Sequence, residues 1–224
     1  MSAIPEPLHP CILNLLTLVL AAGWPVWPLI VCSVLALALV IERLLQLRTQ
    51  NVVPDHLLEE VLEVTRQGMP DARQVGQIAR RGVLGQVLAS ALLTLQEHPD
   101  ATAGQVRSSL EMAGRLAVLR LERYLSALAT IASAAPLLGL LGTVIGMIEI
   151  FGAQSPQGVQ QPAQLAHGIS VALYNTAFGL VVAIPSLMFW RYFRSTVDRH
   201  VLTLEIAAER FARHLEQLRS RAEP

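Results

Sequence analysis

Two long apolar segments in the C-terminal half constrain the fold of this chain more than any other feature. They are residues Thr130–Phe151, TIASAAPLLGLLGTVIGMIEIF, and residues Leu165–Trp190, LAHGISVALYNTAFGLVVAIPSLMFW. Neither contains lysine or arginine, and Glu149 is the only carboxylate in either. At about 1.5 Å per residue, each would form a helix long enough to cross a hydrocarbon core of about 30 Å. The sequence therefore predicts an all-α integral membrane protein.

A third apolar segment, residues 24–41, ends at Glu42 and Arg43 and completes three predicted spans. The 17 basic residues are all arginine, and they lie between Arg43 and Arg123 or from Arg191 onward. Three crossings put both arginine groups on one side of the membrane, which the positive-inside rule makes the cytoplasm. The N-terminus is then predicted to lie outside and the C-terminus in the cytoplasm.

The predicted organisation follows from these spans. In chain order, it is an N-terminal segment with an interfacial helix (1–23), transmembrane helix 1 (24–41), a cytoplasmic helical region (42–129), transmembrane helix 2 (130–151), an outer loop (152–164), transmembrane helix 3 (165–190) and a cytoplasmic C-terminal helix (191–224). The interfacial helix is predicted for the stretch CILNLLTLVLAA, which is apolar but too short to span a bilayer. The second and third spans are expected to extend into a cytoplasmic helical bundle.

Composition excludes several classes of function. Of the 224 residues, 53% are apolar and 15% are charged, whereas soluble domains usually carry about 25% charged residues. The formal net charge of zero argues against a nucleic-acid partner. The 6 histidines are scattered, and the sequence has no phosphate-binding glycine loop, no paired cysteines and no nucleophile–base set. We therefore expect no enzymatic activity, no cofactor and no metal site.

Residues 42–129 have the polarity and apolar spacing of helices outside the membrane. Residues 71–96 are predicted to form one helical stretch, and residues 98–100, His-Pro-Asp, a turn. From about Ala103 the helical pattern continues into the second span, which predicts one unbroken helix.

The C-terminal segment carries a heptad seam of apolar residues. Its members are Val197, Val201, Leu204, Ala208, Phe211, Leu215 and Leu218. Such a seam packs against other helices. The sequence leaves two partners open: the chain's own cytoplasmic helices, or another subunit.

Small residues line one face of each C-terminal span. We expect the following glycines and alanine to pack helices: Gly139, Gly142, Gly146, Gly168, Ala172 and Gly179. Helices in lipid associate where small residues let their backbones approach closely. We therefore expect subunits of a homo-oligomer to meet along the second and third spans.

Each C-terminal span also contains a threonine deep inside, Thr143 and Thr176. Both are predicted to lie about 12–16 Å from the outer surface, near the middle of the bilayer. Each hydroxyl could simply bond a backbone carbonyl of its own helix, or the two could form a shared polar layer. Glu149 is too near the outer boundary to titrate at that depth, so any carboxylate on a proton path must come from a partner chain.

The runs APLLGLLGTVIGMIEIF and GISVALYNTAFGLVVAIP resemble the signature of the MotA/TolQ/ExbB proton-channel family. The run GWPVWPLIVCSVLALALVIERLLQLR is similar to the first spans of ExbB-like members. The length and the three spans resemble ExbB and TolQ more than MotA. One position departs from the pattern, because Val171 stands where some ExbB proteins have a glutamate.

The resemblance implies a pentameric channel in the bacterial inner membrane, with a periplasmic N-terminus. An ExbD- or TolR-like single-span partner would supply a protonatable aspartate, and proton flow would drive a TonB- or TolA-like protein. Thr143 and Thr176 match the pore threonines of the family. Two alternatives to an ExbB-like channel remain: a TolQ-like subunit of the Tol-Pal envelope system, and a membrane scaffold that conducts no ions.

Overall fold

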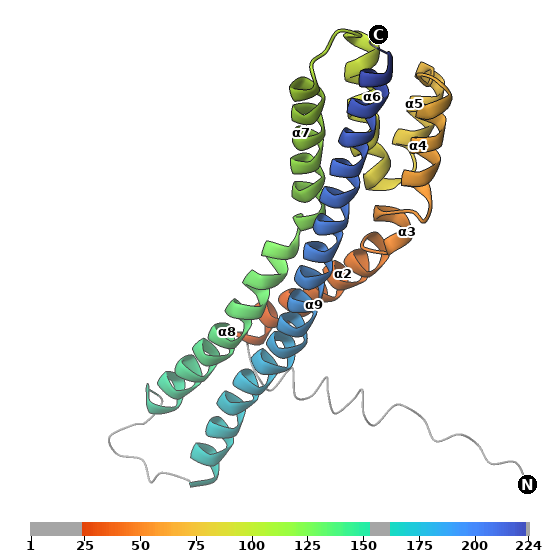
Figure 1. The fold of residues 1–224 in the computed structure, drawn as a ribbon. Coiled ribbons are helices and arrows are strands. Elements are labelled where there is room, and N and C mark those ends of the chain that lie inside the picture. Colours follow the sequence, from red (N-terminus) through yellow and green to blue (C-terminus); the bar gives the residue numbers. More distant parts are fainter. Residues whose placement is uncertain (1–23, 153–161, 223–224) are drawn as a thin grey trace, which may run out of the picture. The chain divides into compact units, whose positions relative to one another are not determined.

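The computed structural model describes residues 24–152 and 162–222, and all regular structure in those ranges is helical (Figure 1). The helices are α2 (Val26–Gln46), α3 (Thr49–Val52), α4 (Leu57–Gln67), α5 (Ala72–Ala79), α6 (Gly82–Glu97), α7 (Ala103–Glu122), α8 (Leu125–Gly152) and α9 (Pro162–Ala222). The predicted interfacial helix and most of the predicted outer loop lie outside the described residues.

Three of the helices in the described ranges are long and apolar enough to cross a membrane. They contain the three predicted spans: α2 the first, α8 the second, and the N-terminal half of α9 the third. Pro136 and Pro185 lie inside α8 and α9, and neither interrupts its helix. In the described ranges, the prediction of an all-α fold with three helices long and apolar enough to span a membrane is thus confirmed.

The chain divides into two units, each described here by itself. The first, the membrane unit, comprises residues 1–40 and 127–190 and contains the three spans. The second, the helical unit, comprises residues 41–126 and 191–224.

The predicted unbroken helix from Ala103 into the second span is wrong, because the helix stops and restarts at Arg123 and Tyr124. Arg123 has extended geometry (φ −50°, ψ 136°) and Tyr124 a left-handed φ of 66°. Left-handed backbone is unfavourable for a residue with a Cβ by about 1–2 kcal/mol. One hydrogen bond and two cation–π contacts stabilise the break. Arg43 Nη1 donates to the Leu121 carbonyl oxygen at 3.0 Å, and the guanidiniums of Arg43 and Arg123 lie 5.3 and 4.7 Å from the Tyr124 ring.

The predicted single helical stretch over residues 71–96 is also divided. Its first part, α5, begins with a capping box in which Asp71 and Gln74 bond each other's backbone N–H groups. A second helix then starts at Gly82, whose φ is 87°. A Cβ at Gly82 would lie 2.6 Å from the Asn51 carbonyl oxygen, so the close approach of α3 requires glycine there.

The predicted turn at residues 98–100 is present, with the Ala101 N–H donating to the His98 carbonyl at 2.9 Å. Directly after it, α7 begins with a second capping box, formed by Thr102 and Gln105. Both helix starts carry the local sequence pattern that predicts them.

The core of the helical unit lies between α6, α7 and the C-terminal half of α9. The heptad seam of α9 faces this core, and Val197 and Phe211 are fully buried. Leu88 and Leu92 of α6 are buried in the same unit. The buried members of the seam therefore pack against the chain's own helices, while Val201, Ala208 and Leu218 are only partly buried. Contact of the seam with another subunit stays a prediction.

Candidate functional site

The three spans of the membrane unit meet at a small apolar cluster. Leu29 of α2, Ala135 of α8 and Ala183 of α9 are buried together, and Leu138, Phe178 and Val182 pack around them. The cluster brings the two glycine-rich helices to the first span. On α8, Ala135 lies about two helical turns from Thr143.

Around Gly139 and Gly179, α8 and α9 approach closely enough for backbone to touch backbone. A Cβ at Gly139 would lie 2.8 Å from the Asn175 carbonyl oxygen and 3.3 Å from the Gly179 Cα. A Cβ at Gly179 would lie 2.6 Å from the Ala135 carbonyl oxygen. Such distances leave no room for any side chain at either glycine.

Further toward the connection between the two helices, the contact changes from backbone to side chains. A Cβ at Gly142 would lie 2.9 Å from Asn175 Cγ, and a Cβ at Gly168 2.5 Å from Ile150 Cγ1. Gly146 is less tight, with 3.3 Å between an added Cβ and the Cβ of Ala172.

The small-residue face is therefore occupied within one chain. Ala172 is only 3% exposed, because it packs against α8 of its own chain. Gly168, Ala172 and Gly179 thus pack α9 against α8 of the same chain. That subunits of a homo-oligomer meet along the second and third spans stays a prediction.

The two threonine hydroxyls make different hydrogen bonds. Thr143 Oγ1 donates to the Leu140 carbonyl oxygen of its own helix at 2.7 Å. Thr176 Oγ1 donates across to the Gly139 carbonyl oxygen of α8 at 3.3 Å. Gly139 and Thr143 lie one turn apart on α8, so both hydroxyls reach the same short stretch of that helix.

Both hydroxyls use their protons for carbonyl oxygens, which determines what else they can do. A hydroxyl oxygen that donates its proton still has lone pairs that accept hydrogen bonds. Thr143 and Thr176 are each half-buried. Each can therefore accept a hydrogen bond from water or from a protonated carboxyl group.

Asn175 is a polar residue of this region that our sequence reasoning missed. Its side chain is 1% exposed and lies against Gly142, between α8 and α9. The available signal was an amide directly before Thr176 in an otherwise apolar span. Buried polar side chains in membrane helices commonly connect helices by hydrogen bonds.

No carboxylate or basic side chain lies within five residues of Thr143 or Thr176 in the sequence. Glu149 is exposed and lies near the end of α8. Within the described ranges, no cluster of histidine, cysteine, aspartate or glutamate could hold a metal ion. The membrane unit thus supplies hydroxyl and amide groups but no group that titrates near neutral pH at this depth.

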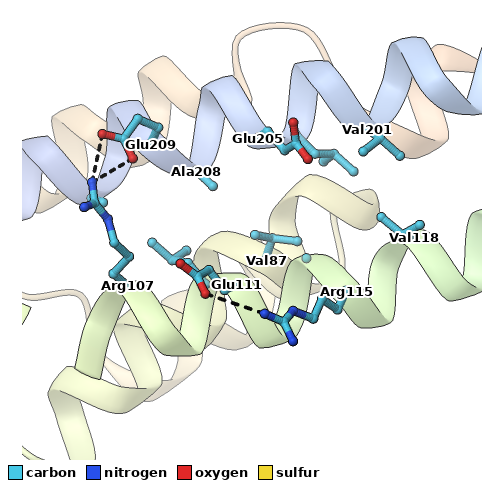
Figure 2. A pocket seen from close by; sticks show the side chains of 13 residues that line it. Val87, Arg107, Glu111, Arg115, Val118, Val201, Glu205, Ala208 and Glu209 are labelled. Atoms are coloured by element: carbon cyan, nitrogen blue, oxygen red, sulfur yellow. Dashed lines mark hydrogen bonds and ion pairs between the residues drawn. The ribbon is translucent and has the colours of Figure 1, made fainter. Parts of the chain in front are cut away.

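The helical unit has a groove of about 300 Å³ between α7 and α9 (Figure 2). Ion pairs flank it: Arg107 lies 2.8 Å from Glu209, and Arg115 lies 3.9 Å from Glu111. Its apolar lining includes Val118 of α7. Glu205 also lines the groove and forms no ion pair within the described residues, so the lining carries one more carboxylate than guanidinium groups.

Comparison with known proteins shows to which family the chain belongs. Residues 78–206 match the model of the MotA/TolQ/ExbB proton channel family. An ExbB-like biopolymer transport protein of Synechocystis sp. is 33% identical over 188 residues, which cover 83% of this chain and 88% of that protein.

Two further relatives represent one subfamily each, ExbB and TolQ. The biopolymer transport protein exbB1 of Vibrio cholerae is 32% identical, over 82% of this chain and 80% of its own. The Tol-Pal system protein TolQ of Haemophilus influenzae is 39% identical, over 42% of each chain. The protein therefore belongs to the MotA/TolQ/ExbB proton channel family, whose members are multi-pass proteins of the inner membrane and subunits of membrane transport systems.

Proposed function

We propose that this chain is an ExbB-like subunit of a proton-channel stator. With an ExbD-like single-span partner, it would convert the proton-motive force into work on a TonB-like protein for transport across the outer membrane. The observation that carries the proposal is the pair of hydroxyls at Thr143 and Thr176, on adjacent helices in a region without carboxylate or basic side chains.

The chemistry of the hydroxyls supports different roles for the two proteins in proton transfer. A threonine hydroxyl does not titrate near neutral pH, so it cannot carry the transported proton as a stable charge. The proton carrier would be an aspartate of the partner, and its protonated carboxyl could donate to Thr143 or Thr176. Because residue 171 is a valine, this mechanism uses no carboxylate of this chain at that position.

We further propose a homopentamer with a periplasmic N-terminus and a cytoplasmic C-terminus. The distribution of arginine supports the orientation, because neither the N-terminal segment nor residues 152–164 contain one. The partner's helices would occupy the pore that the second and third spans surround.

A TolQ-like role in the Tol-Pal system is the second candidate. The identity to TolQ of H. influenzae favours it, although that match covers less of the chain than the ExbB matches do. A scaffold that conducts no ions would need the same small-residue packing, but it would not need the two hydroxyls.

The double variant Thr143→Val/Thr176→Val tests the channel proposal. Valine keeps the shape of threonine and removes the hydroxyl. A lost interhelical hydrogen bond in a membrane costs about 0.6 kcal/mol, too little to prevent folding. We expect normal expression and normal co-purification of the partner, but loss of proton-dependent uptake by cells.

A matched control is Ser133→Ala/Ser186→Ala, which also removes one hydroxyl from each helix. Both serines bond carbonyls of their own helices, as Ser133 does with Ala129 at 3.0 Å and Ser186 with Val182 at 2.7 Å. The control should support normal uptake. Unchanged uptake in the threonine variant would show that the hydroxyls are structural and would favour the scaffold.

A further inference from the structure

A basic hollow of about 690 Å³ lies in the helical unit, between the end of α2, α3 and the part of α9 that follows the third span. Arg43, Arg48, Arg199 and His200 contribute to its lining, together with the hydroxyls of Thr49 and Thr203. None of the described residues that line it is an aspartate or glutamate. The hollow therefore has a positive potential that its own lining does not compensate.

Arg43 is the most unusual member of this lining, since its side chain is only 1% exposed. Its Nη1 donates to the Leu121 carbonyl, but its buried Nε and Nη2 have no hydrogen-bond partner in the described part of the chain. Arginine keeps its charge in proteins, and a buried charge is costly unless an opposite charge compensates it. An anion in the adjacent hollow would supply that charge.

The nearby carboxylates do not compensate Arg48 and Arg199. Glu122 and Asp198 both pair with Arg194, at 2.7 and 3.3 Å. Glu42 accepts a hydrogen bond from Gln46 at 2.8 Å, and its charge acts on its neighbour Arg43. The exposed Arg48 and Arg199 form no ion pair within the described residues, so their guanidiniums are available to an external anion.

The position of the hollow along the chain indicates the source of that anion. On α2, the apolar run of the first span ends just before Arg43, and on α9 the run of the third span ends at Trp190, just before the lining residue Tyr192. Tyrosine and tryptophan concentrate where the hydrocarbon core meets the headgroups. Basic pockets beside transmembrane helices at that level bind phospholipid headgroups.

We propose that this hollow binds the phosphate of an anionic phospholipid. Arg48 and Arg199 would contact the phosphate, Thr49 would donate a hydroxyl hydrogen bond to it, and the charge of the buried Arg43 would attract the anion. The Thr203 hydroxyl is not a donor to the phosphate, because it donates to the Arg199 carbonyl oxygen at 2.9 Å. Arg199 is already oriented on α9, because its Nη2 donates to Thr196 Oγ1 at 3.2 Å. The lipid would thereby join the ends of the first and third spans.

The test measures lipid retention by the full-length protein. The protein is transferred from mild detergent into nanodiscs containing phosphatidylcholine and phosphatidylglycerol, and bound lipid is counted by native mass spectrometry after release. We expect the wild type to retain phosphatidylglycerol in preference to phosphatidylcholine. Each arginine near a membrane surface strengthens the binding of an anionic lipid by about a factor of five. The double variant Arg48→Gln/Arg199→Gln should therefore bind phosphatidylglycerol roughly 30-fold more weakly.

The control variant is Arg66→Gln/Arg213→Gln, which removes the same charge from ion-paired arginines away from the hollow. It should retain the lipid as the wild type does. Equal loss in both variants would indicate a general charge effect and overturn the site, as would equal retention of phosphatidylcholine by the wild type. Displacement of the lipid by millimolar inorganic phosphate would assign the hollow to a free anion instead and refute the lipid.

Discussion

The close approach of α8 and α9 makes a quantitative prediction for Gly179→Ala. The new methyl group would lie 2.6 Å from the Ala135 carbonyl oxygen and 3.2 Å from the Gly139 Cα. Ordinary contacts begin at 3.4 Å, so the carbonyl must recede by about 0.8 Å, the difference between 3.4 and 2.6 Å. The neighbouring atoms are backbone, which cannot move without separating the helices.

Three contributions set the size of the effect. Overpacking of this kind costs about 1–3 kcal/mol. Separation also weakens the hydrogen bond from Thr176 to Gly139, worth about 0.6 kcal/mol. The greater helix propensity of alanine offsets up to about 1 kcal/mol of this loss. We expect a net loss of about 1–3 kcal/mol in the free energy of unfolding.

Two other glycines provide a graded series. Gly146→Ala meets the Ala172 Cβ at 3.3 Å and should be nearly neutral. Gly114→Ala meets no atom within 4 Å and should stabilise α7 by about 0.5–1 kcal/mol. Equilibrium unfolding in mixed micelles of mild detergent and dodecyl sulfate, followed by far-ultraviolet circular dichroism, measures all three. The reasoning fails if Gly179→Ala raises stability as Gly114→Ala does.

Three further predictions concern packing, capping and topology. Ala172→Leu should lower the free energy of unfolding by about 1–3 kcal/mol in the same assay, because the residue is buried against Gly146; unchanged stability would contradict this contact. Asp71→Ala should lower it by about 1 kcal/mol through loss of the cap, and Asp71→Asn should restore most of it. A cysteine introduced at Gln157 should react with an impermeant thiol reagent once the outer membrane is permeabilised, and reaction only after lysis of the inner membrane would reverse the proposed orientation.

The sequence alone determined the features that depend on local composition. Long runs without arginine predict the spans, because a charged side chain in hydrocarbon is costly wherever the helices pack. The Asp71–Gln74 and Thr102–Gln105 capping boxes predict helix starts, because each joins residues three positions apart.

Tertiary contacts decided the features that the sequence could not predict. Neither glycine nor proline marks the break at Tyr124, and the residue that caps the end of α7 is Arg43, 78 positions from Leu121. The glycines of α8 predicted close packing, but only the structure assigned α9 of the same chain as their partner. The basic hollow likewise combines residues that are far apart in the sequence, such as Arg48 and Arg199. Such contacts depend on the three-dimensional path of the chain, and no short window of sequence contains both partners.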